Sequence, residues 1–205
     1  RRVRTACRLY SLDIREDGEE LLDARAMRAH AGFILLRLAD PLLISRLLKL
    51  AAGPVVVVDE PIHGQPVVWV TEDSFDGASQ VAKHLLRLGH RRIGFLDVDD
   101  RQRWNPTKHA GYCAALEEAG LSVDQELTVS PAVGVPADGP EAPHLVDEAV
   151  ESLLSLENPP TAIFAYDDLR AVLVCEGLRR RGLEPGRDVS VAGFGDTASR
   201  LGTSD

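Results

Sequence analysis

Residues 84–96, HLLRLGHRRIGFL, contain the pattern that decides how the fold is read. The leucines before Gly89 continue an apolar repeat that begins near Ser74 and has the period of a helix. Gly89 stands where a left-handed residue commonly follows a helix, and IGFL then has the composition of a short buried strand. A helix that ends in glycine and leads directly into an apolar strand predicts one step of an α/β repeat.

The basic cluster His90, Arg91 and Arg92 lies between that helix and that strand, and it allows two interpretations. Such a cluster could contact nucleic acid, but cations just past a helix C-terminus also complement the helix dipole by about 0.3–1 kcal/mol. The chain has 23 Lys and Arg against 32 Asp and Glu, a net charge of −9. DNA affinity comes mainly from cations that neutralise phosphates. We therefore interpret the cluster as the corner between the helix and the strand.

The same order of strand, turn and amphipathic helix recurs along the chain. Strands are predicted at 7–12, 32–36, 55–60, 67–70, 93–96, 161–166 and 188–194, and helices at 19–30, 40–51, 74–88, 105–119, 146–153 and 167–178. The run VVVVDE at 55–60 is expected to be buried on both faces, and residues 129–143 are expected to form a loop. The alternation implies an α/β fold in which helices cover both faces of parallel sheets.

Composition restricts the class of protein. With 44% hydrophobic and 27% charged residues the chain is expected to be globular. Cys7, Cys113 and Cys175 are far apart, which favours free thiols in a reducing compartment over disulfides or a metal site. We find neither an apolar run of about 20 residues that could span a bilayer nor a secretory leader, so a cytoplasmic protein with no membrane partner is expected.

Four segments, in order and at typical spacing, resemble the effector-binding core of the LacI/GalR family of bacterial transcriptional regulators. They are DGASQVAKHLLRLGHRRIGFL, KHAGYCAALEEAGL, PPTAIFAYDDLRAV and GLEPGRDVSVAGFGD. The resemblance implies two doubly wound parallel-sheet lobes of the periplasmic-binding-protein-like type I fold. The N-terminal lobe would span residues 1–70 and be incomplete, and the C-terminal lobe would span 71–205.

The resemblance also implies a function: the ligand-sensing and dimerisation core of a regulator, usually a repressor. Such a protein is a homodimer that binds a small-molecule effector, here expected to be a sugar, between its lobes. It binds operator DNA through a helix-turn-helix headpiece, and no segment of this chain resembles one. The alternative is a periplasmic sugar-binding receptor of a transport system with the same fold. A secretory leader in the full-length protein would favour the receptor, and a helix-turn-helix would favour the regulator.

The candidate site follows from a rule that does not depend on the family: in open α/β sheets, ligands bind beyond the carboxyl ends of the strands. The residues that leave the predicted strands are Arg37, Asp59, Asp73, Asp97, Asp167 and Asp196. Carboxylates accept adjacent hydroxyl hydrogen bonds, and an aromatic side chain can stack on a sugar ring. We predict that the effector contacts Asp59, Asp73, Trp104, Lys108, Asp167 and Asp196. For each aspartate the alternative is a solvated loop residue or a helix N-cap, and the cap is preferred for Asp168.

Three positions depart from the pattern that the resemblance implies. Lys108 stands where the family usually has an arginine that contacts the effector, and a lysine cannot reproduce the two-pronged contact of a guanidinium group. Asp167 stands where asparagine or serine is common, and Gly195 replaces the first aspartate of a G-F-D-D motif. These changes argue for an unusual effector or for a regulator that has lost its response to an effector.

Enzymatic alternatives have little support in the sequence. GFGDTA, from Gly193 to Ala198, formally matches a dinucleotide fingerprint, but no βαβ unit or suitably spaced acidic residue follows it. We find no nucleophile elbow, no H-E-x-x-H and no phosphate-binding G-x-x-x-x-G-K-[ST] motif. The histidines lack metal-ligand spacing. The chain is therefore expected to be a binding protein without catalytic residues, cofactor or metal.

Overall fold

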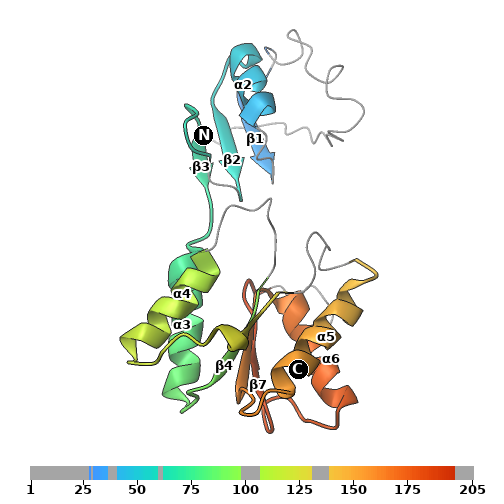
Figure 1. Ribbon diagram of the computed structural model, residues 1–205. Helices are drawn as coiled ribbons and strands as arrows, with labels where there is room; N and C mark the ends of the chain where they lie inside the picture. The colour runs from blue at the N-terminus through green and yellow to red at the C-terminus, as the bar shows by residue number, and fades with distance from the viewer. Residues whose placement is uncertain are drawn as a thin grey trace, which may run out of the picture. The chain divides into compact units, whose positions relative to one another are not determined.

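The computed structural model describes residues 28, 30–36, 41–59, 62–97, 107–130 and 139–196. The chain divides into two compact units, Arg1–Glu72 and Asp73–Asp205 (Figure 1). The predicted strand at 7–12, nearly all of the predicted helix at 19–30, and the residues Arg37, Asp40, Trp104 and Asn105 lie outside the described residues. Among the described helices, none has the length and apolar character that a bilayer crossing requires.

Unit 1 contains a parallel sheet in the order β1-β2-β3, formed by β1 (Phe33–Leu36), β2 (Val55–Val58) and β3 (Val68–Val70). Helix α2 (Pro41–Leu50) connects β1 to β2. Its buried residues Leu43, Ile44 and Leu47 form one core with Leu35, Val55 and Val57 of the sheet. The alternation of buried residues along β1 and β2 places this core on one face of the sheet.

The opposite face of this sheet carries apolar side chains that remain exposed. Ile34 pairs with Val56, which pairs in turn with Val68. In the same way Leu36 pairs with Val58, which pairs with Val70. The exposed fractions are 71% for Ile34, 61% for Leu36, 64% for Val68 and 56% for Val70. The prediction that β2 is buried on both faces is therefore wrong: Val55 and Val57 are buried, whereas Val56 and Val58 are only half-buried. The physical reason is that α2 covers one face only.

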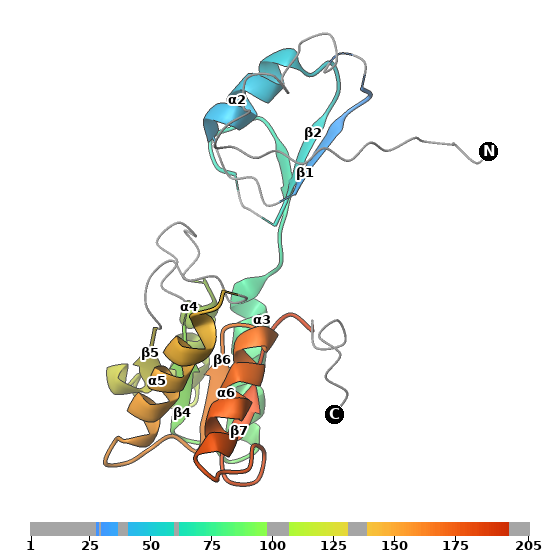
Figure 2. The same ribbon diagram turned by 90° about the vertical axis from the view of Figure 1, so that its right-hand side faces the viewer.

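Unit 2 is a three-layer α/β unit. Its parallel sheet has the order β5-β4-β6-β7, from β4 (Ile93–Leu96), β5 (Thr128–Val129), β6 (Ala162–Ala165) and β7 (Ser190–Ala192). Helices α3 (Ser74–Arg87) and α4 (Thr107–Glu118) cover one face, and α5 (Ala142–Leu154) and α6 (Asp168–Arg180) cover the other (Figures 1 and 2). A short 3₁₀ turn, η1 (Gln125–Leu127), precedes β5. The predicted α/β fold with parallel sheets is thus confirmed.

The strand IGFL contributes to both cores of unit 2. Ile93 and Phe95 join the core under α3 and α4, whereas Leu96 joins the core under α5 and α6. Phe95 stacks on Tyr112 of α4 with 5.0 Å between ring centroids, and the Tyr112 hydroxyl donates a 2.7 Å hydrogen bond to the Ile93 carbonyl. Burial raises the pKa of Tyr112 far above its ordinary value, so this hydroxyl stays protonated and keeps donating.

The basic cluster forms the corner that its position predicts. Gly89 has φ of 98°, the left-handed conformation expected just past a helix. Arg91 Nη1 donates to the carbonyls of Leu86 and His90, each at 2.9 Å. Arg92 donates to the Asn158 carbonyl at 2.8 Å and pairs with Asp124 at 3.1 Å.

His90 completes this corner on the other side. Its two ring nitrogens are hydrogen-bonded with Thr161 Oγ1 at 2.8 Å and Ser190 Oγ at 3.0 Å. Because Ser190 begins β7 and Thr161 directly precedes β6, the histidine ties the amino-terminal ends of two neighbouring strands together. The cluster therefore holds the helix-to-strand turn in place, as predicted.

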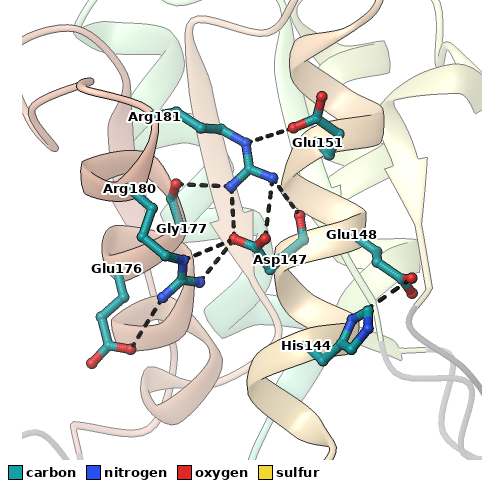
Figure 3. A network of polar contacts seen from close by, with 8 residues as sticks. All are labelled: His144, Asp147, Glu148, Glu151, Glu176, Gly177, Arg180 and Arg181. Carbon is teal, nitrogen blue, oxygen red and sulfur yellow. Dashed lines mark hydrogen bonds and ion pairs between the residues drawn. The ribbon is translucent and has the colours of Figure 1, made fainter.

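Helices α5 and α6 are joined by a polar network around Asp147 (Figure 3). Arg180 Nη2 lies 2.8 Å from Asp147 Oδ1, and Arg181 Nη1 lies 2.6 Å from the same atom. Arg181 Nε also pairs with Glu151 Oε2 at 2.7 Å. Gly177 permits this approach, because a Cβ at that position would lie 3.2 Å from Asp147 Oδ1.

Most predicted element boundaries are correct to within a few residues, with three corrections. The N-cap of α6 is Asp167, whose side chain accepts from the Arg170 amide, and not Asp168, which is the first helical residue. Strand β5 falls at the start of the segment predicted as a loop. Ala119, predicted on the apolar face of α4, is exposed. Of the predicted free thiols, Cys113 and Cys175 are free and half-buried, and Cys7 lies outside the described residues.

Candidate functional site

The carboxyl ends of the strands of unit 2 lie at one edge of the sheet, because all four strands are parallel. Asp97 follows β4, Tyr166 and Asp167 follow β6, and Phe194 lies two residues beyond β7. The amino-terminal ends of α4 and α6 reach the same edge, since contacts from Lys108 and Asp168 meet these residues. We call this cluster of Lys108, Tyr166, Asp167, Arg170 and Phe194 the strand-end site.

Lys108 supplies the cation of the strand-end site, and its charge lies among aromatic rings. The residue is only 6% exposed. Its Nζ atom lies 4.1 Å from the ring centroid of Tyr166 and 4.0 Å from that of Phe194. It also donates a long, 3.4 Å hydrogen bond to the Tyr166 carbonyl. Ring faces attract cations, and the attraction grows as water is excluded, so the two rings offset part of the cost of burying the ammonium group.

Two glycines allow Phe194 and its chain to approach. A Cβ at Gly77 of α3 would lie 2.6 Å from Cε2 of the Phe194 ring, and a Cβ at Gly193 would lie 2.5 Å from Oδ1 of Asp168. The Phe194 carbonyl accepts a 3.2 Å hydrogen bond from the Asp168 amide. The ring is thus held between α3, the start of α6 and the lysine.

Asp167 caps α6 and pairs within its own helix. Its Oδ1 accepts the Arg170 amide at 2.8 Å, and its Oδ2 forms an ion pair with the Arg170 guanidinium group. Arg170 is buried, so the pair anchors the first turn of α6 within the strand-end site. The Asp167 side chain remains 29% exposed, and a carboxylate oxygen can accept a second hydrogen bond. A ligand hydroxyl can therefore still donate to it.

The other predicted aspartates differ in their surroundings. Asp73 is exposed, and its Oδ1 accepts the Asp76 amide at 3.0 Å, which makes it the N-cap of α3. Asp196 is exposed with φ of 53°. Asp59 belongs to unit 1, where it follows β2 with φ of 79° and donates its amide to the Val70 carbonyl at 3.0 Å. Left-handed backbone is costly for most residues, but aspartate is among the more tolerant.

Several residues of the strand-end site were not predicted from the sequence. Tyr166 and Phe194 each follow an apolar strand run, and an aromatic residue at a strand end is the signal that could have identified them. Arg170 stands three residues after Asp167, a helical pairing distance. Beside the site, Thr107 precedes Lys108 at the start of α4 and has a buried Oγ1 without a hydrogen-bond partner among the described residues. No sequence pattern marks it.

This arrangement suits binding of a small polar molecule. Tyr166 and Phe194 are half-buried and keep part of their apolar surface accessible, although Lys108 lies over one face of each ring. Asp167 offers carboxylate oxygens, and Thr107 has a hydroxyl that a ligand could satisfy. Among the residues that the structure describes, no three His, Cys, Asp or Glu side chains gather so as to hold a metal ion. Trp104, the predicted stacking residue, lies outside the described residues.

Comparison with known proteins gives a consistent result. A family model described as a periplasmic binding protein-like domain matches residues 82–204. The chain is 32% identical over 149 residues to the HTH-type transcriptional repressor PurR of Haemophilus influenzae, covering 72% of this chain and 42% of that protein. The chain spans about two fifths of the length of the curated relatives it matches.

Solved structures of transcription regulators also match this chain. A regulatory protein of the LacI family from Chloroflexus aggregans matches with a TM-score of 0.73 and 26% identity, over 91% of this chain and 66% of that one. A complex of the transcriptional regulator CelR with cellobiose matches with a TM-score of 0.68 and 26% identity, over 88% of this chain and 53% of that one. Both matches extend over more of this chain than unit 2 alone.

Proposed function

We propose that the chain, which belongs to the periplasmic binding protein-like domain family, is the effector-binding core of a LacI-type regulator and senses a small molecule for transcription control. The full-length protein would be a homodimer whose operator affinity changes when the effector binds. It would contact DNA through a helix-turn-helix headpiece and act in the cytoplasm. The observation that carries the sensing role is the strand-end site, where Lys108, Tyr166 and Phe194 meet beside Asp167.

The effector we propose is a neutral or cationic polar molecule of the sugar class. Ring faces beside carboxylate acceptors fit a molecule that has both apolar C–H surface and hydroxyl groups. Asp73, Trp104, Lys108, Asp167 and Asp196 of the second lobe, with Asp59 of the first, are the proposed contacts. CelR, a similar regulator, binds cellobiose, which supports this class.

A strongly anionic effector is disfavoured on electrostatic grounds. Lys108 already has two ring faces and a carbonyl as partners, and Arg170 is paired with Asp167, whereas Asp59 and Asp196 would face the ligand with negative charge. Placing like charges together in a site that excludes water is costly. Gly195 offers no side-chain acceptor where the family usually has one. Losing a hydrogen bond to a charged group costs about 1.5–3 kcal/mol, so affinity for a simple hexose should be weak.

Calorimetric titration with sugars, polyols, nucleobases and sugar phosphates tests this assignment. We expect a sugar or polyol to bind and Asp167→Ala to remove most of the affinity, a loss of about tenfold to hundredfold. Asp188→Ala is the matched control, because Asp188 is exposed near the opposite end of β7 and its carboxylate contacts the neighbouring Arg187 and the Glu184 amide, both far from the strand-end site. Binding of sugar phosphates alone, or unchanged affinity in Asp167→Ala, would overturn the proposed site.

The second candidate function is a periplasmic sugar-binding receptor with the same fold. The relatives are transcription regulators, which favours the first candidate and gives no support to an enzyme. The full-length sequence distinguishes the two, since a helix-turn-helix supports the regulator and a secretory leader supports the receptor.

A further inference from the structure

A cationic ridge runs along an exposed flank of α3. Lys83 and Arg87 are one helical turn apart and therefore share a face, and Arg91 follows just past the helix end. Two hollows flank this ridge, one of about 400 Å³ beside α4 and one of about 420 Å³ beside the end of β7. Lys83 and Arg87 line both hollows. A bound segment could thus contact the ridge from either side.

The lining of these hollows has a charge opposite to that of the whole chain. It contains three cations, Lys83, Arg87 and Arg91, with His84, against one carboxylate, Glu118. The chain as a whole has a net charge of −9. Small or aliphatic side chains form the rest of the walls, mainly Val81, Leu86, Ala115, Ala119 and Ala192. The complementary ligand combines carboxylates with aliphatic groups.

The ridge already holds one carboxylate. Lys83 Nζ lies 2.6 Å from Glu118 Oε2, although both side chains are well exposed. One turn further on, Arg87 is exposed and makes no hydrogen bond or ion pair among the described residues. Arg91 donates from Nη1 to two carbonyls and forms no ion pair with a carboxylate among the described residues. The Lys83–Glu118 ion pair therefore shows the kind of contact that Arg87 could make with a carboxylate of a partner.

We propose that this flank of α3 docks an acidic segment of a protein partner. Its carboxylates would bind Arg87 and Arg91, and an aliphatic side chain would fill the hollow lined by Leu86, Ala115 and Ala119. Duplex DNA fits less well, because phosphates gain nothing from these apolar walls and the negative field of the chain opposes them. Charge complementarity at the ridge should also increase the association rate at low salt.

Fluorescence anisotropy with the 205-residue chain tests the proposal. The probe is a short fluorescein-labelled peptide of glutamate with leucine at every third position, titrated beside an all-glutamate peptide and a labelled DNA duplex. Arg87→Glu should weaken binding of the mixed peptide about fivefold to tenfold. Arg179→Glu is the matched control, because Arg179 is an exposed arginine on α6 and the change in net charge is the same.

Selective loss of binding in Arg87→Glu, with the leucine-containing peptide preferred, would support the docking site. Equal weakening in both variants would overturn it in favour of diffuse charge attraction. Tighter binding of the duplex, equal binding of the all-glutamate peptide, or no binding of the mixed peptide would each contradict it. Circular dichroism of both variants establishes that they are folded. Because no effector is present, failure here leaves the sensing proposal untouched.

Discussion

Lys108 was predicted to contact the effector. In the structure its charge lies over the rings of Tyr166 and Phe194, two residues far from it in the sequence. Tyr166 and Phe194 come from the ends of different strands, so only the folded sheet brings them to the lysine. The position of Lys108 at a strand-end edge could be predicted from the α/β pattern. Its partners could not, because they depend on strand order and on the close approach that Gly77 allows.

Two substitutions separate the charge of Lys108 from its packing. Lys108→Met keeps a long chain between the rings and removes both the cation–π attraction and the cost of burying the ammonium group, so we expect the free energy of unfolding to change by less than about 1 kcal/mol. Lys108→Ala also leaves a void and should cost about 1 kcal/mol more. Urea denaturation of both variants measures this. A loss well above about 1 kcal/mol in Lys108→Met would contradict this, because it would mean that the ring contacts outweigh the cost of burying the charge.

At the scale of elements, boundaries were predictable where one residue type marks them. Gly89 and Asp73 mark the ends of α3 correctly. The cap of α6 was misplaced by one residue, because Asp167 and Asp168 both suit a cap and the choice depends on where β6 ends. Strand β5 has only two residues, Thr128 and Val129, too few to show a period. Pairing with β4, not local preference, determines that strand.

The network between α5 and α6 predicts a dependence of stability on pH. Hydrogen bonds from Arg181 and Arg180 lower the pKa of Asp147 to about 2 from an ordinary 3.8. The carboxylate therefore stabilises the fold above about pH 4, and this contribution is lost as pH falls toward 2. The Asp147 side chain is 32% exposed, so after solvent screening we expect only about 1 kcal/mol.

Asp147→Asn should consequently unfold more easily than the parent chain at pH 7, and this difference should shrink below about pH 4 and nearly disappear at about pH 2. Urea denaturation across this range provides the measurement. Glu157→Gln is the control, since Glu157 is exposed and has no ion pair within the described part of the chain. A pH-independent difference would show that the amide disturbs packing instead.

At the scale of the whole molecule, the α/β architecture with parallel sheets followed from the repeated strand-turn-helix pattern and is confirmed. The effector and the oligomeric state did not follow, because they depend on surface side chains that no periodicity constrains. DNA affinity is a prediction at this scale. The chain should give a flat anisotropy titration with duplex DNA at physiological salt. The reason is that the chain is acidic and that Arg91 and Arg92 already donate hydrogen bonds to carbonyls at the turn between α3 and β4. Tight, salt-dependent, sequence-selective binding would contradict this.

The uncovered sheet face of unit 1 has a consequence for how the protein behaves in solution. Scattered exposed leucines such as Leu88 are ordinary, but Ile34, Leu36, Val68 and Val70 form contiguous rows on one flat surface. Such a surface should bind the fluorescent dye ANS and promote aggregation at high protein concentration. Val68→Lys should lower the ANS fluorescence and raise the solubility of the chain. Leu88→Lys makes the same charge change at an isolated leucine and should do neither. ANS titration and light scattering of the two variants would show how much this surface contributes to aggregation of the chain at high concentration.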